Sequence, residues 1–408
     1  MGASLGWIDF SIEDRNRVGS ILDMLKPEGM VDELGLGTNR DGLANAMFPG
    51  ISTIQTRAKY FFFIPYILSD YQRLSLKAKA GKSALRYLED EENEVMWKLA
   101  DKYEHRDGTG VIGITKRRNE KIARRASAIY WNGIATYEFI KTNGLSAQVF
   151  LRQSGGLVES LLSNMEKEDD KGKDDLDADY SNTFKIKVPP NPGWQTDLSL
   201  DLSKKESEFF KDQILFIAKG KLIAELLENQ ELWLIFKEAS SFADFARKAV
   251  NLSLPPTLLK TIVLAHDFSE LMYGAHILYN ILIQKVLFKN DEFGDDWRIW
   301  KSGLKSNMLD FNGFLPEDVF AYNLRGKNET KNFIIAWWSQ AELGFGDLRK
   351  IETDILKQEA EVKKSKARLM YRKPDGVVEN SWVGLKHFDY RFNEVKRILI
   401  DIKSGLDK

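Results

Sequence analysis

The stretch GVIGITKRRNEKIARRASAIYWNGIATYEF, residues 110–139, is the most one-sided part of the sequence. Between positions 116 and 125 it holds one acid, Glu120, and six basic residues. Those six are Lys116, Arg117, Arg118, Lys121, Arg124 and Arg125. An aromatic pair, Tyr130 and Trp131, follows directly. The stretch predicts one surface for an anion and another for a packed core.

Helical spacing supports that division into two surfaces. Residues at i, i+4 and i+7 lie on one side of an α-helix. The basic residues at this spacing are Arg117, Lys121 and Arg124. An apolar stripe with the same spacing lies on another side and contains Ile122, Ala126 and Ile129. We therefore expect a basic helix that carries phosphate-binding cations on its exposed side.

Composition limits the class of protein. A chain of 408 residues with 43% hydrophobic residues predicts a globular protein of two or three domains. The net charge of −1 gives no global argument for binding nucleic acid or membrane, so any anion site has to be local. The absence of cysteine excludes disulfides, thiolate metal sites and cysteine nucleophiles. Because no signal peptide or membrane-spanning run is visible, the sequence favours a cytoplasmic protein without membrane contact.

The acidic segment EKEDDKGKDDLDADY, residues 166–180, marks the expected domain boundary. Eight acids and few apolar residues are typical of a solvated tether rather than of a calcium loop. We therefore predict an N-terminal helical domain over 1–165 and a C-terminal helical domain over 181–408.

The rest of the chain predicts a mainly α protein with a few short strands. Residues 183–194, TFKIKVPPNPGW, alternate as a strand does until two prolines end it. Ser203 and Glu206 have the spacing of a capping box, and helical patterns continue from there. The helices expected after it lie at about 204–219, 221–228, 230–239, 240–248, 255–265, 267–288, 316–324, 329–341, 345–370 and 388–405.

Two further groups of cations are candidates for phosphate contacts. Arg57 and Lys59 stand near the start of a helix expected from Ser52 or Thr53. The positions four and seven after Arg57 look buried, which predicts a partly buried cation with a specific partner. The segment KKSKARLMYRKP, residues 363–374, contains Arg372 and Lys373 and no acid. A solvated helix surface explains this second group about as well as a phosphate site does.

Catalytic and cofactor motifs are not visible, so we assign no catalytic residue, no metal ligand and no cofactor. His266 and Glu270 share a helix side, but two ligands are too few for a metal, which favours a structural pair. His387 and Asp389 could form a catalytic pair, although a capping role for Asp389 at a helix N-terminus is favoured.

Several stretches resemble an uncharacterised bacterial family. They include LGWIDFS (5–11), VDELGLGTNRD (31–41), FPGISTIQTRAKYFFFIPYI (48–67), RRASAIYWNGI (124–134), AHDFSELMYGAHILYN (265–280) and LKHFDYRFNEVKRILIDI (385–402). The resemblance implies an accessory protein encoded near helicase, phospholipase-D-like and methyltransferase genes in phage-defence or mobile-element islands. It implies no catalytic residue.

The expected function is a non-enzymatic nucleic-acid-binding subunit of a multi-protein defence-type system, in contact with DNA or RNA and with subunits such as a helicase or nuclease. One alternative is a protein–protein adaptor anchored by exposed tryptophans. Those tryptophans are Trp233, Trp297, Trp300, Trp337 and Trp338. A metal-dependent nuclease or other phosphoryl-transfer enzyme has the least support.

Overall fold

The computed structural model describes residues 32–117, 120, 122, 124–153, 184–323, 326–374 and 376–408. The described residues are mainly α-helical, which confirms the predicted class. The expected N-terminal helix after Ser11 and the tether 166–180 lie outside the described residues. No helix in the described part of the chain is both long enough and apolar enough to cross a membrane.

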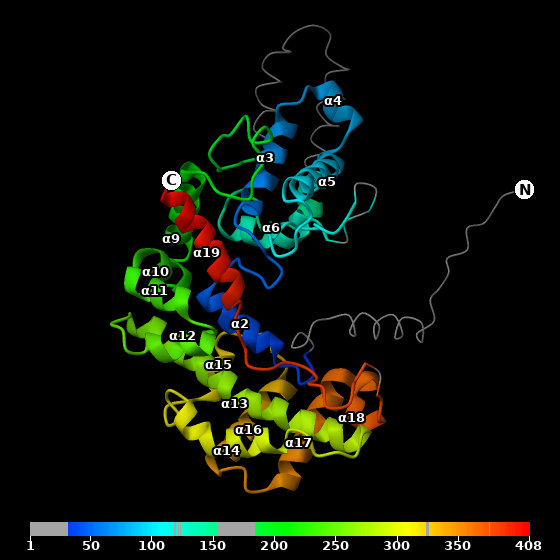
Figure 1. Cartoon of the computed structure of the whole chain (residues 1–408), viewed down its shortest axis with the longest axis vertical. Helices are drawn as coiled ribbons and strands as arrows, with labels where there is room; N and C mark the ends of the chain where they lie inside the picture. The colour runs from blue at the N-terminus through cyan, green and yellow to red at the C-terminus, as the bar shows by residue number, and fades with distance from the viewer. Residues whose placement is uncertain are drawn as a thin grey trace, which may run out of the picture. The chain divides into compact units, whose positions relative to one another are not determined.

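The chain forms two compact units, and each is built from two separate stretches of sequence (Figure 1). Unit 1 consists of Met1–Ala44 and Phe242–Tyr390, and unit 2 consists of Asn45–Ser241 and Arg391–Lys408. This grouping differs from the two sequential segments expected from the acidic tether. The C-terminal helix α19 (Phe392–Leu406) packs on α9 (Lys204–Ile217), which assigns both helices to unit 2.

Unit 2 is organised around α3 (Tyr60–Gln72), which packs against α5 (Ala84–Lys102) and α6 (Ala126–Thr136). Helix α3 begins at Tyr60 rather than near Ser52, because residues 52–59 form turns held by polar side chains. Its aromatic side chains are buried. The aromatic core that they join contains Phe61, Phe62, Tyr130, Tyr137, Phe139 and Phe210. The other helices that lie wholly in this unit are α4 (Leu76–Gly81), α10 (Leu222–Glu228) and α11 (Gln230–Glu238).

A glycine in α6 permits the close approach of this core. A Cβ atom at Gly133 would lie 2.5 Å from the Phe61 ring and 2.5 Å from the carbonyl oxygen of Gly50. Real Cβ atoms do not come this close to a backbone oxygen. The SAIYWNG stretch therefore places its glycine where α6 crosses α3 and the turn before it.

The predicted strand over 183–194 was wrong in extent. Of the described residues in this range, 184–194, only Ile186 pairs as a strand residue does, in an isolated antiparallel bridge to Ile140. Two hydrogen bonds flank the bridge, from Lys141 N to Lys185 O at 3.0 Å and from Lys187 N to Phe139 O at 2.9 Å. Pro189 and Pro190 follow at once and cannot donate to a ladder, so the pairing ends there.

Unit 1 is built on α13 (Pro256–Leu287), a helix of 32 residues. Two helices predicted separately at 255–265 and 267–288 are one continuous helix, and α14 (Gly294–Asn307) was not predicted. Helix α2 (Gly37–Met47) starts in this unit. The other helices of unit 1 are α12 (Phe242–Ala249), α15 (Pro316–Phe320), α16 (Asn328–Glu342), α17 (Leu348–Lys363), the short η1 (Lys364–Lys366) and α18 (Arg368–Tyr371).

The tryptophans expected as exposed interface anchors are buried, so that prediction was wrong. Their exposed fractions lie between 1% for Trp337 and 8% for Trp297 and Trp338. Trp300 donates its Nε1–H to Glu270 O at 3.0 Å, and Trp337 donates to Leu271 O at 3.0 Å. Indole rings combine a large apolar area with a single donor, and carbonyl groups of α13 satisfy these two donors inside the core.

Polar residues on α13 fix the segment that runs along this helix before residue 390. Asn280 pairs with both backbone groups of Val383, accepting from N at 2.6 Å and donating to O at 2.9 Å. Gln284 accepts from Asn380 N at 3.2 Å and donates to Ser381 O at 3.3 Å. The buried amides of α13 therefore serve the fold.

Candidate nucleic-acid interface

The basic segment, residues 114–125, is not helical where the structure describes it. It runs through turns and bends, and α6 begins only at Ala126. The residues at its two ends have conformations that an α-helix does not contain. Gly113 just before it adopts a positive φ of 72°, and Arg125 is extended, with φ −75° and ψ 160°. Cations spaced at i, i+4 also repel each other on a helix, which disfavours the predicted conformation.

Helix α5 holds the end of the basic segment that leads into α6. Arg125 Nη1 lies 3.1 Å from Glu89 Oε1. Three residues further along α5, the Glu92 carboxylate accepts from Ser127 N at 2.5 Å and from Ser127 Oγ at 2.9 Å. A carboxylate at this place satisfies an amide that the first turn of α6 leaves without a partner.

Glu92 is almost completely buried, with an exposed fraction of 2%. Burial raises the pKa of Glu92 to about 7, while the hydrogen bonds from Ser127 and the charge of Arg125 act in the opposite direction. The sequence analysis did not identify Glu92 as a functional or structural residue. The pattern that could have indicated it is an acid within an apolar helix stripe, formed by Leu88, Glu92, Val95 and Leu99.

The C-terminal end of α5 holds the other end of the basic segment. His105 Nδ1 lies 2.7 Å from Ile114 O, and His105 Nε2 lies 3.3 Å from Asp101 Oδ1. A small pocket of about 190 Å³ lies beside these contacts. It is lined by Trp97, Asp101, His105, Lys116 and Arg117. Two of the predicted phosphate-binding cations therefore line one concave site.

Solvent exposure differs among the cations of the basic segment. Arg118 and Lys121 lie outside the described residues. Arg117 and Arg124 are exposed, and within the described part of the chain neither side chain forms an ion pair. Lys116 Nζ lies 3.7 Å from Glu120, a solvent-exposed contact that contributes at most about 1 kcal/mol.

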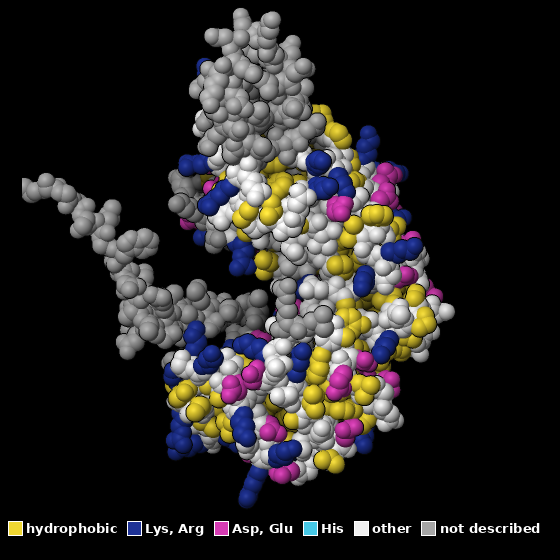
Figure 2. Space-filling model, turned by 180° about the vertical axis from the view of Figure 1, so that it is seen from behind, with side chains coloured by type: hydrophobic (Ala, Val, Ile, Leu, Met, Phe, Trp, Pro, Cys, Tyr) yellow, Lys and Arg dark blue, Asp and Glu magenta, His cyan; other side chains and the backbone are white. Residues whose placement is uncertain are grey.

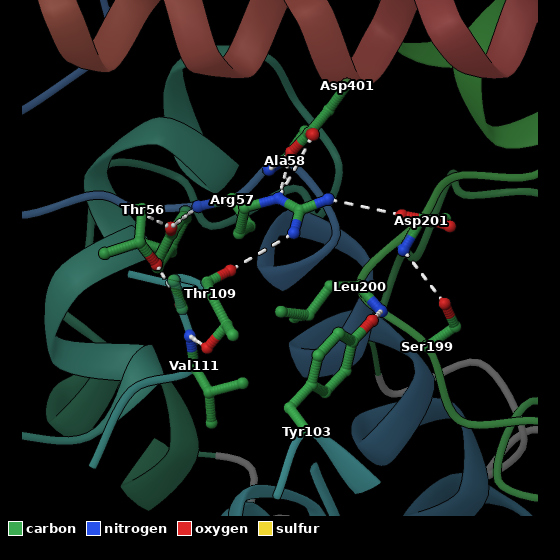
Figure 3. A network of polar contacts seen from close by, with 12 residues as sticks. Thr56, Arg57, Ala58, Tyr103, Thr109, Val111, Ser199, Leu200, Asp201 and Asp401 are labelled. Atoms are coloured by element: carbon green, nitrogen blue, oxygen red, sulfur yellow. Dashed lines mark hydrogen bonds and ion pairs between the residues drawn. The ribbon is translucent and has the colours of Figure 1, made fainter. Parts of the chain in front are cut away.

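Arg57 is a partly buried cation with specific partners, which confirms that expectation (Figure 3). Its Nε donates to both oxygens of Asp401, at 2.9 and 3.1 Å, and Nη1 donates to Thr109 O at 3.2 Å. Its Nη2 lies 3.3 Å from Asp201. Burial alone would lower the pKa of Arg57, but hydrogen bonding and the charge of Asp401 outweigh it and raise the pKa. The guanidinium thus joins α19 to the turn before α3.

Lys59 is paired in the same way. Its Nζ lies 2.7 Å from both carboxylate oxygens of Glu206, and the Tyr66 hydroxyl donates to the same carboxylate at 2.8 Å. Glu206 also closes the capping box with Ser203 that the sequence predicts. The charges of Arg57 and Lys59 are therefore neutralised inside unit 2.

The second basic cluster, residues 363–374, lies in unit 1. Lys363 and Arg368 both bind Glu33. Arg372 and Lys373 are exposed, and Lys373 Nζ donates to Ser365 O at 2.7 Å. Figure 2 shows several Lys and Arg side chains on the side of unit 1 that carries α18, interrupted by Asp and Glu.

The histidine candidates form structural contacts in unit 1. His266 Nδ1 lies 2.8 Å from Asp267, and both side chains are buried. Glu270 binds His387 Nε2 at 3.2 Å rather than His266. Asp389 accepts from the backbone N of Phe242, the first residue of α12, so it caps a helix distant in sequence. Among the described residues, no group of three or more His, Cys, Asp or Glu could hold a metal ion.

A model for a family of unknown function, DUF6361, matches residues 2–404 of the chain. No curated protein and no solved structure matches.

Proposed function

Because the chain belongs to the DUF6361 family, whose function is unknown, its role has to be inferred from its side chains, and we propose that it binds nucleic acid through the basic segment. The proposal is a non-enzymatic subunit that contacts the phosphate backbone of DNA or RNA. It would act within a multi-protein bacterial defence-type assembly, as the family resemblance implies.

The exposure of Arg117 and Arg124 is the observation that carries this proposal. Guanidinium groups donate in a planar fork that matches phosphate oxygens. The basic segment is also held at both ends, by Glu89 and Glu92 near Arg125 and by His105 at Ile114. Two fixed ends reduce the conformational entropy that the segment loses when it binds a strand.

The proposal assigns different roles to the basic residues. Lys116, Arg117 and Arg124 are the main phosphate contacts among the described residues, and Arg118 and Lys121 belong to the same segment. Arg125 positions the segment through Glu89. Arg57 and Lys59 hold the fold and are not proposed as phosphate contacts. Contacts of this kind fix the position of a strand and do not read its sequence.

A salt titration of DNA and RNA binding tests this proposal. Replacing Arg117, Lys121 and Arg124 by Glu should weaken binding and reduce the slope of log K against log salt by about 2 to 3. A matched variant replaces Lys204, Lys205 and Lys219, which are exposed on or just after α9, by Glu. This control should retain most of the affinity.

Absence of binding by the wild-type protein at low ionic strength would overturn the proposal. The adaptor alternative would then rest on the exposed apolar side chains of the second basic cluster, because the tryptophans are buried. Met370 is 60% exposed and Tyr371 is 49% exposed.

A further inference from the structure

The pocket between α5 and the basic segment brings two cations together at one concave site. Phosphate contacts spread along a strand do not require such a pocket. We propose that it binds the terminal phosphate of a nucleic-acid strand in preference to an internal phosphodiester. This inference rests on the proposed nucleic-acid binding and names the group that the site recognises.

The charges that line the pocket suit a dianion. Lys116 and Arg117 contribute two cations. Both ring nitrogens of His105 face acceptors, since Nδ1 donates to Ile114 O at 2.7 Å and Nε2 lies 3.3 Å from Asp101. Asp101 is the one carboxylate among the five residues that line the pocket. The two cations of the lining, Lys116 and Arg117, therefore outnumber its carboxylate.

A terminal phosphate carries more charge than an internal one. A phosphomonoester has about −1.5 to −2 charges at pH 7, whereas a phosphodiester has a single charge. Glu120 lies 3.7 Å from Lys116 and partly compensates its positive charge. The positive charge that remains in the pocket still favours a dianion over a monoanion.

The size of the pocket also favours a single chemical group. The pocket has a volume of about 190 Å³ and is lined by five residues. A lining this small contacts one phosphate group rather than several nucleotides. A strand end extends from the phosphate in one direction only, so it can enter a concave site that a continuous backbone passes by.

One pocket-lining residue carries a buried donor that has no partner among the described residues. Trp97 lines the pocket, and its buried Nε1 forms no hydrogen bond with any residue that the structure describes. Buried N–H groups without an acceptor are rare in folded proteins and call for an explanation. A phosphate oxygen in the pocket is an acceptor of the kind that this indole lacks.

The test compares two single-stranded DNA oligonucleotides of the same sequence, one with a 5′-phosphate and one with a 5′-hydroxyl, at one salt concentration. A third oligonucleotide carries the phosphate at its 3′ end. We expect the wild-type protein to bind at least one phosphorylated form about tenfold more tightly, the effect of one additional set of charge-assisted hydrogen bonds. Arg117→Gln should remove this preference, and Trp97→Phe should reduce it while retaining the ring in the wall.

Lys98→Gln is the matched control, because Lys98 is exposed on the same helix and does not line the pocket. It should retain the preference for the phosphorylated end. Equal binding of all three oligonucleotides by the wild type, or a preference that survives Arg117→Gln, would overturn the pocket inference and leave the proposed function intact. Absence of binding to every oligonucleotide at low salt would overturn both.

Discussion

Asp401 in α19 accepts two hydrogen bonds from Arg57 Nε, although 344 positions separate the two residues in the sequence. The same carboxylate accepts from Ala58 N at 2.9 Å. One side chain thus binds the cation and the backbone of the turn that leads into α3. The pair joins the two sequence stretches of unit 2 to each other.

Replacing Asp401 by Asn should lower the free energy of unfolding by about 3 kcal/mol, because it leaves the Arg57 charge partly buried without its main counterion. Chemical denaturation followed by circular dichroism measures this change. Asp197→Asn is the control, since the Asp197 side chain is 95% exposed in its pair with Lys102 and should change stability by less than about 1 kcal/mol. Equal effects of the two variants would show that the Arg57 pair is not a stabilising feature.

Glu92 predicts a dependence of stability on pH. Its folded pKa of about 7 lies above the ordinary value of 4.5, so the folded protein binds a proton that the unfolded chain has already lost between these values. Stability should therefore fall as the pH rises from about 4.5 to about 7, by up to about 1.4 kcal/mol per pH unit, and this contribution should level off above pH 7. Glu92→Gln keeps an acceptor for Ser127 and removes the titration.

Unfolding curves at pH 5, 6, 7 and 8 compare the wild type with Glu92→Gln. The difference in stability between the two proteins should change with pH in the direction given above. If both proteins respond to pH in parallel over this range, Glu92 does not titrate there.

A side chain at position 133 should overpack the aromatic core of unit 2 and lower its stability. Gly133→Ala adds a Cβ atom that would lie 2.5 Å from Phe61 and from Gly50 O, and the required shift should destabilise unit 2 by about 1 to 3 kcal/mol. This loss outweighs the gain of about 1 kcal/mol that alanine brings to a helix. In Gly81→Ala nothing lies within 4 Å of the new atom, so this control should be neutral or stabilising in the same thermal unfolding assay.

Asn280 predicts a local effect in unit 1. Asn280→Ala removes the acceptor for Val383 N and the donor for Val383 O. Amide hydrogen exchange at Val383 and its neighbours should accelerate, while the region of α13 around Glu270, which binds Trp300, exchanges as in the wild type. A variant that leaves exchange at Val383 unchanged would show that the paired amide does not hold this segment.

The sequence predicts local helix signals well in this chain. The Ser203 and Glu206 capping box is present, and the expected helices after it match α9, α10, α11 and α16 closely. These signals depend on neighbouring residues only. The continuity of α13 was missed because its polar residues, such as His266 and Asp267, look like a break when their partners elsewhere in the chain are not known.

The exposure of two cations in the basic segment was predicted, but the conformation of the segment was not. The cations at Arg117 and Arg124 are exposed, as expected, yet they lie on an irregular segment. Its conformation depends on Glu89 and Glu92 of α5 and on His105 just after this helix, which no pattern within residues 114–125 can indicate. The tryptophans were misjudged for a similar reason, since their burial depends on how α14 and α16 pack on α13.

The division of unit 2 into two sequence stretches has a consequence during synthesis. A ribosome that adds about 5 to 20 residues per second needs roughly 20 to 70 seconds to travel the 344 positions from Arg57 to Asp401. From the synthesis of α9 until that of α19, the nascent chain exposes the side of α9 that α19 later covers, while the second sequence stretch of unit 1, Phe242–Tyr390, is made in between. Ribosome-bound chaperones therefore have a defined target on this chain, and a shortened product that stops before Asp401 would remain a substrate for proteases.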